Sequence, residues 1–240
     1  LRAVFPNETG DLLPGMFVRA RLHHGTDNNA LLVPQAAVSR TPKGQASVML
    51  VTGENTVPMV ISAVELEPDD YLMKPFSQSV LRSRLQRIQQ KKHCLYGVYQ
   101  AMMMQDWPTV EVQARHLLEQ YPRYAPYLRR IQVQAMLHTG KFDAAKTELA
   151  PILSQRRPHW ALLQQARLEM ESGQHQRCQA LCEEALSTNK YLVEAYDLQS
   201  ENLMRGGDPD QARQLLKKAL EISPYQLQRL QQFFQLSQND

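Results

Sequence analysis

Hydrophobic residues recur at every second position in the first quarter of the chain. In residues 16–22, the side chains of Met16, Val18, Ala20 and Leu22 alternate with Phe17 and two arginines, which is the period of a β-strand with one wetter face. Short apolar or β-branched runs follow, separated by turn residues, at 30–33, 46–51 and 57–63. We therefore expect an all-β stretch over residues 1–63. Because residues 1–5 already read as a strand, we also expect the start of a domain to be missing.

The pattern changes near residue 76, from where the chain is rich in Gln, Leu, Ala, Arg and Glu, and poor in glycine. This composition predicts helices. Four turn-like triplets end at spacings of 35, 33 and 34 residues, which predicts four repeats of about 34 residues. The triplets end at Trp107, Phe142, His175 and Pro209. Three positions later stand small or β-branched residues, where two helices must approach closely: Val110, Ala145, Cys178 and Ala212.

Residues 91–226 resemble the tetratricopeptide repeat (TPR) family, most clearly in the stretch QARQLLKKALEISP at 211–224. The resemblance implies a solenoid of paired helices whose first helices line a concave groove. Val98, Val133 and Ser200 stand where the family prefers Gly or Ala, and Lys190 replaces a closing proline. Residues 227–240 would form a capping helix and tail.

Residues 64–90 resemble the last strand and last helix of a response-regulator receiver domain, through the run YLMKPF at 71–76. The resemblance implies that Lys74 contacts a phosphoryl group, that the Lys74-Pro75 peptide bond is cis, and that Tyr71 is the switch aromatic. A receiver also needs an acidic pair and a phosphoacceptor aspartate. Upstream only Asp11 and Asp27 are available, in an all-β context. We therefore expect a remnant without its phosphoacceptor.

Residues 1–58 resemble the periplasmic adaptors, or membrane fusion proteins, of RND-type efflux pumps. The matches lie at 1–7, 12–22 and 32–44. The resemblance implies the end of the adaptor's β-barrel and the start of its membrane-proximal domain. The family's helical hairpin, lipoyl-like domain, export signal and lipid-anchor cysteine do not occur here. With those parts present, the segment would pair with efflux pump subunits.

The sequence thus predicts an α+β fold by segment, a partial all-β fragment followed by a predominantly α-helical TPR solenoid. Its parts are residues 1–63, 64–90, 91–226 and 227–240. Such a combination indicates a chimera, either a natural fusion or a mis-assembled reading frame.

Charge and composition narrow the classes of partner. Lysine and arginine number 27 against 24 acidic residues, with the signs interspersed, so the footprint of a nucleic-acid binder is absent. No apolar run approaches eighteen residues and no export signal is recognisable, which predicts a cytoplasmic chain without a membrane span. The adaptor interpretation would instead place it in the periplasm beside the inner membrane. Three cysteines favour a reducing compartment.

Two clusters could bind metal, but simpler interpretations are stronger. Asp69 and Asp70 could hold a hard cation, yet they fit a solvated loop after Pro68. His175, Cys178 and Cys182 share one helical face, as zinc ligands can, yet the repeat register makes the cysteines small core residues. No catalytic or cofactor motif occurs. We therefore expect no metal, no cofactor and no enzyme.

The repeat register predicts which side chains line the groove. Soft methionines and aromatics suit a peptide or helix as partner, and arginines suit its carboxylates. The predicted groove residues are Tyr99, Met102, Met103, Tyr127, Arg130, Gln134, Trp160, Leu163, Arg167, Met170, Glu194, Asp197 and Glu201. About half could instead pack against neighbouring repeats or the C-terminal helix.

The leading hypothesis is therefore a non-catalytic protein-interaction module, the TPR output region of a two-component protein. The alternative is a fragment of a periplasmic adaptor of an RND multidrug efflux pump.

Overall fold

The computed structural model describes residues 38–40, 46–53, 56–65 and 67–237. Contacts within the chain divide it into two units, Leu1–Pro34 and Gln35–Asp240, and all described residues belong to the second. The strands expected at 1–5, 16–22 and 30–33, with most of the adaptor-like stretch, lie outside the described residues.

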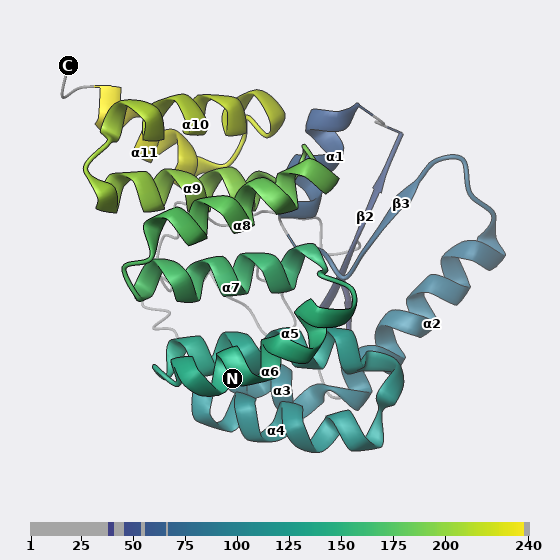
Figure 1. The fold of residues 1–240 in the computed structure, drawn as a ribbon. Helices are drawn as coiled ribbons and strands as arrows, with labels where there is room; N and C mark the ends of the chain where they lie inside the picture. Colours follow the sequence, from purple (N-terminus) through teal and green to yellow (C-terminus); the bar gives the residue numbers. More distant parts are fainter. Residues whose placement is uncertain (1–37, 41–45, 54–55, 66, 238–240) are drawn as a thin grey trace, which may run out of the picture. The chain divides into compact units, whose positions relative to one another are not determined.

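The helices after residue 95 form antiparallel pairs that stack side by side (Figure 1). Each pair corresponds to one predicted repeat, with α3, α5, α7 and α9 as first helices and α4, α6, α8 and α10 as second helices. The helical repeats predicted from the sequence are therefore confirmed. The elements are β1 (Val38–Arg40), β2 (Ala46–Thr52), α1 (Val57–Glu65), β3 (Asp70–Met73), α2 (Gln78–Cys94), α3 (Tyr96–Met103), α4 (Trp107–Gln120), the short 3-10 turn η2 (Pro122–Tyr124), α5 (Ala125–His138), α6 (Phe142–Gln155), α7 (His159–Glu171), α8 (His175–Thr188), α9 (Val193–Gly206), α10 (Pro209–Ile222) and α11 (Leu227–Ser237).

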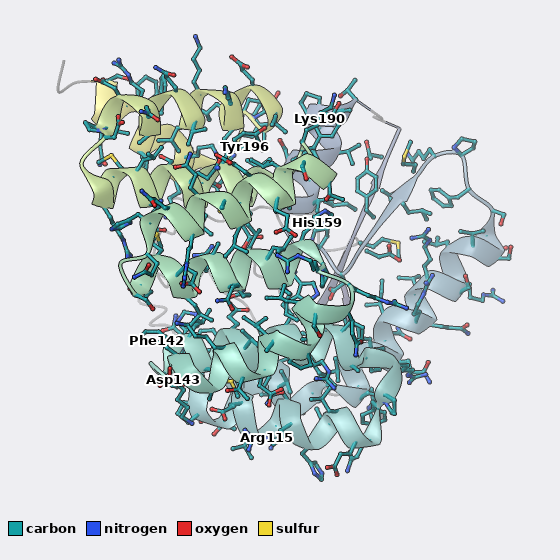
Figure 2. The ribbon with its side chains drawn as sticks, viewed as in Figure 1. Arg115, Phe142, Asp143, His159, Lys190 and Tyr196 are labelled. Carbon is teal, nitrogen blue, oxygen red and sulfur yellow. The ribbon has the colours of Figure 1, made fainter. Side chains whose placement is uncertain are left out.

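The turns inside the repeats share one backbone conformation. Gln105, Gly140, Gly173 and Gly207 have φ of 55°, 70°, 72° and 83°. The amide N–H of the residue after each one closes the first helix, for example from Lys141 to the Met136 carbonyl at 2.8 Å, which is the Schellman arrangement. The second helix then begins at once, as α6 does with Phe142 and Asp143 (Figure 2).

Small residues sit where the paired helices touch. Val110, Ala145, Cys178 and Ala212 are all fully buried, as the repeat register predicts. Cys182 is fully buried beside Cys178 in the cluster that joins α7, α8 and α9, so the prediction that both cysteines are core residues is also confirmed. Burying this apolar surface between neighbouring repeats drives the stacking.

The strands form a sheet in the order β1-β2-β3 among the described residues. β1 pairs antiparallel with β2, and β2 pairs parallel with β3 in the register Met49↔Asp70 to Thr52↔Met73. A parallel pair needs a crossover connection, and here the connection contains α1, which contacts α10.

The strand expected at 57–63 is wrong, because this segment is the helix α1, Val57–Glu65. A short apolar run does not distinguish a strand from a packed helix by its pattern alone. Pro58 lies in the first turn of α1, where a proline costs no hydrogen bond.

The strand and helix expected after residue 64 are present as β3 and α2. The Lys74-Pro75 peptide bond is cis, and Ser77 caps α2 by accepting a hydrogen bond from the Val80 amide at 3.3 Å. However, α2 continues to Cys94, past the boundary expected at residue 90. It ends at Leu95, which is fully buried in the first core cluster.

Candidate peptide-binding groove

A cavity of about 530 Å³ lies along the first helices of the four repeats. Met102 from α3, Arg130 and Gln134 from α5, Arg167 and Met170 from α7, and Glu194 and Glu201 from α9 line it. We call this the groove cavity. Seven predicted groove residues are thus brought together, because residues at corresponding positions of stacked first helices face the same side.

The remaining lining residues of the groove cavity complete its chemistry. They are Glu67, Leu137, His138, Phe142, Gln164 and Glu171. The His138 ring stacks on the Trp107 indole, with 3.9 Å between ring centroids. Gln164 Oε1 is buried without a hydrogen-bond partner among the described residues. The cavity therefore offers apolar surface, a stacked ring and amide groups as well as charges.

Most charges around the groove cavity are already paired. Arg205 binds Glu171 at 2.9 Å and Glu201 at 2.8 Å, and Arg167 lies 3.6 Å from Glu194. Arg130, in contrast, has no ion-pair or hydrogen-bond partner within the described ranges. A group that enters the cavity would therefore meet Arg130 as the available cation.

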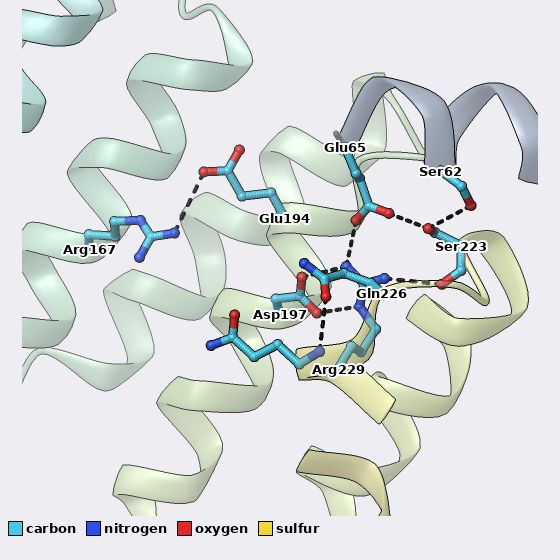
Figure 3. A network of polar contacts seen from close by, with 9 residues as sticks. Ser62, Glu65, Arg167, Glu194, Asp197, Ser223, Gln226 and Arg229 are labelled. Carbon is cyan, nitrogen blue, oxygen red and sulfur yellow. Dashed lines mark hydrogen bonds and ion pairs between the residues drawn. The ribbon is translucent and has the colours of Figure 1, made fainter. Parts of the chain in front are cut away.

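Asp197 lines a smaller adjoining cavity of about 220 Å³, and Arg167, Glu194 and Glu201 also line it. Its carboxylate is held by Arg229 of α11, whose Nε and Nη2 donate to the two Asp197 oxygens at 2.7 Å each (Figure 3). Both carboxylate oxygens of Asp197 therefore already accept hydrogen bonds from Arg229 in a bidentate ion pair.

Arg229 also binds the N-terminal part of the unit. Its Nη2 lies 2.6 Å from Glu65 Oε1 of α1, and its Nη1 donates to the Ser223 carbonyl at 3.1 Å (Figure 3). The Ser223 hydroxyl donates to the other Glu65 oxygen and lies 3.0 Å from the Ser62 hydroxyl. The side chain of Arg229 is only 2% exposed. Burial opposes its charge, but its hydrogen bonds to Asp197 and Glu65 outweigh this, and the pKa of Arg229 is raised.

Tyr99 and Tyr127, two predicted groove residues, contact each other beside the groove cavity. Their ring centroids are 6.2 Å apart, and burial together with their mutual hydrogen bond raises the pKa of Tyr99. The Lys91 Nζ lies 3.8 Å from the Tyr127 ring centroid, as in a cation–π contact. Burial lowers the pKa of Lys91. These phenols are thus covered by α2 rather than open to a ligand.

Besides Tyr99 and Tyr127, three predicted groove residues line neither cavity. Leu163 is 1% exposed within the core cluster of α7, α8 and α9. Trp160 packs against the cluster that contains Val133 and Leu168, and Met103 is 76% exposed at the end of α3. Successive residues of a helix are rotated by 100°. An error of one residue in the assumed start of a helix therefore moves a side chain at the edge of the groove face to another face.

The candidate metal clusters are engaged in other contacts. Asp69 Oδ2 lies 2.8 Å from Lys92 Nζ, and Asp70 Oδ1 lies 2.7 Å from Arg84 Nη1. Asp70 begins β3, so it does not belong to a loop as expected. His175 Nδ1 lies 2.8 Å from the Asn202 side-chain oxygen. The described part of the chain contains no group of three or more His, Cys, Asp or Glu residues suited to a metal.

Of the receiver-like residues, Tyr71 is half-buried in β3 and the Lys74 side chain is exposed, while the Lys74 amide donates to the Thr52 carbonyl at 2.8 Å. No helix in the described ranges is long and apolar enough to cross a membrane.

Sequence reasoning misses Glu65, Glu67 and Arg229. The first two belong to an acidic stretch within the receiver-like segment, and Arg229 lies outside the predicted groove positions. Only the density of acidic residues between 65 and 70 could have signalled a contact with a basic surface.

Comparisons with known proteins separate the two ends of the chain. Residues 1–26 match the β-barrel domain of RND membrane fusion proteins. The multidrug efflux pump subunit AcrA of Escherichia coli (strain K12) is 58% identical over 57 residues, which make up 24% of this chain and 14% of AcrA. The chain therefore covers only a small part of that relative.

The helical part is similar to solved TPR structures. A thermophilic TPR protein from Thermus thermophilus matches with a TM-score of 0.53 at 13% identity, over 62% of this chain and 81% of that one. The type IV pilus biogenesis factor PilW matches with a TM-score of 0.52 at 12% identity, over 77% and 86%. The fold of the repeats is therefore that of TPR proteins, preceded by an N-terminal segment similar to efflux adaptors.

Proposed function

We propose that this chain is a non-catalytic protein-interaction module that binds a peptide or helix in the groove cavity. One observation carries the proposal: side chains from four successive first helices line a single cavity, in which Arg130 lacks a partner among the described residues. Met102, Met170 and Phe142 supply adjoining apolar surface. The partner would therefore present a carboxylate next to hydrophobic side chains.

Partner capture from a bacterial lysate with the wild type and with Arg130→Ala/Arg167→Ala tests this proposal. We expect the double variant to lose binding by about 1–3 kcal/mol, the scale of hydrogen bonds to charged groups. Folding should change little, because Arg130 and Arg167 are half-buried rather than core residues and charges that are open to solvent contribute little to stability. Arg156→Ala/Arg177→Ala removes two exposed arginines that line neither cavity and serves as the matched control. Equal capture by all three folded proteins would refute the groove assignment.

A second candidate function rests on the N-terminal match to efflux adaptors. We propose that residues 1–63 are an adaptor-like segment, which would pair with efflux pump subunits together with the other domains of an adaptor. Co-purification of the chain with an RND pump tests this, and a chain that is retained only through its helical part would speak against it.

We further propose that residues 64–90 are the end of a receiver domain, placed before the repeats at 91–226 and the cap at 227–240. The order of β3 and α2 and the parallel pairing of β3 support this. In this proposal the chain is a two-component output region without a phosphoacceptor. Mass spectrometry after treatment with acetyl phosphate should then find no phosphoryl group, and a stoichiometric, hydroxylamine-labile one would contradict the proposal.

A further inference from the structure

Carboxylates at the end of α1 and before β3 lie against the same face of the repeats as the groove cavity. Glu65 binds Arg229 beside Asp197, a predicted groove residue. Two residues later, Glu67 lines the groove cavity itself together with Arg130 and Arg167. Asp69 then pairs with Lys92 at 2.8 Å, near the other end of the solenoid.

The sequence of these contacts follows the order of the repeats. Glu65 reaches the end formed by α9 and α11, Glu67 the middle, and Asp69 the end of α2 next to α3. Asp69 also contributes to the raised pKa values of Tyr99 and Tyr127, although burial is the larger cause for both. One short stretch of the chain thus supplies carboxylates along the surface that a partner peptide would occupy.

The ion pairs around the groove cavity leave one arginine available to an acidic segment. The carboxylates that α7 and α9 contribute to the groove cavity already have arginine partners in Arg205 and Arg167. Arg130 remains the cation without one in the described ranges, and Glu67 is the carboxylate in the same cavity that comes from outside the solenoid. Glu67 is exposed, so its place in the cavity is open to exchange with another carboxylate.

The geometry points to an autoinhibitory role: we propose that Glu65, Glu67 and Asp69, here called the acidic segment, are an intramolecular ligand of the groove, which an acidic partner peptide must displace. This inference rests on the proposed peptide-binding function and adds its regulation. It also specifies the partner further, as an acidic peptide with several carboxylates close together in its sequence, because the segment itself carries them at every second residue.

The test uses the full-length chain and a labelled synthetic peptide with the sequence of residues 64–71 as probe. Fluorescence polarisation would compare the wild type with Glu65→Gln/Glu67→Gln/Asp69→Asn, in which the segment loses its charges. We expect the triple variant to bind the probe at least about tenfold more tightly than the wild type, since its groove is no longer covered. Adding Arg130→Ala to the triple variant should abolish this gain.

Two further variants keep the test decisive. Asp143→Asn/Glu183→Gln/Glu221→Gln makes the same change of charge at exposed positions on α6, α8 and α10, and it should bind the probe like the wild type. Glu67→Gln/Asp69→Asn keeps the Glu65–Arg229 pair, so a gain in binding there excludes misfolding at α11 as its cause.

Equal binding by the wild type and the triple variant would overturn the autoinhibition and leave the groove function standing. Absence of probe binding by every variant would also overturn it, because the segment would then be no ligand. Failure of the proposed function has a different signature, namely unchanged partner capture after Arg130→Ala/Arg167→Ala.

Discussion

At the scale of single residues, the turns inside the repeats all contain a residue in the left-handed conformation, but this residue is not the same amino acid in each turn. Three of the four left-handed positions hold glycine, and the first holds Gln105 at φ 55°. An L-residue with a side chain costs roughly 1–2 kcal/mol in this conformation, whereas glycine does not. The first turn is therefore the strained one.

Gln105→Gly should raise the free energy of unfolding by about 0.5–1 kcal/mol, because relief of strain exceeds the entropy that glycine adds to the unfolded chain. Urea denaturation followed by circular dichroism measures this. The reverse change, Gly173→Ala, should cost about 1 kcal/mol, since no atom lies within 4 Å of the added Cβ and only the backbone is strained. A neutral Gly173→Ala would show that the left-handed turn is not maintained.

At the scale of elements, α11 is held by a buried charge rather than by an extensive apolar face. Arg229 is the buried residue of α11, and its contacts run to α9, to Ser223 and to α1. A helix fixed in this way depends on one side chain, because removing one partner of a buried ion pair leaves the others uncompensated.

Arg229→Met should destabilise the chain by about 2–3 kcal/mol, below the full cost of breaking a buried pair because Glu65 and Asp197 remain partly exposed. Hydrogen exchange should accelerate in α11 and α1 and stay unchanged in α4, α5 and α6. Arg177→Met on α8, an exposed position, is the control. Uniform acceleration in every helix would mean that Arg229 supports the whole unit instead of its end.

Helices and strands could be predicted where the same spacing of residues recurs along the sequence, and could not where a pattern occurs only once. The helix pairs and their small contact residues follow from a period seen four times, so Ala145 and Cys178 are placed correctly. The run at 57–63 offers seven residues without a period that excludes a helix, so the sequence pattern alone does not decide between strand and helix. Leu163 and Trp160 line neither cavity for a related reason. A half-turn of helix separates the cavity side from the core side, and the repeat register does not resolve that difference.

At the scale of the whole molecule, the core of the repeats does not depend on the segments before it. The three core clusters take their residues from between Cys94 and Leu198. In a solenoid, stability is a sum over repeats and their interfaces. What precedes α2 contributes through polar contacts from Glu65, Asp69 and Ser62 at the surface of the repeats.

A fragment of residues 77–240 should therefore stay helical and unfold cooperatively, with lower stability at the α9 to α11 end. Circular dichroism and thermal unfolding of the fragment and the full chain measure this. Loss of the helical signal would show that β2, α1 and β3 are part of the folding core.

The contacts between the repeats and residues such as Glu65 could not be predicted from the charge pattern of the repeats. Glu65 and Arg229, for example, lie more than 160 residues apart in the sequence.

The parallel pairing of β2 with β3 has a thermodynamic consequence for the proposed partner. The register Met49↔Asp70 fixes the segment at Asp70, while α1 fixes it at Glu65, so its carboxylates are tethered at both ends. A ligand joined by a short tether acts at an effective concentration on the order of millimolar. A free peptide present at micromolar concentration must therefore bind about a thousandfold more tightly than the segment does in order to occupy half of the grooves. Weak contacts in the segment are thus sufficient to set a high threshold for the partner.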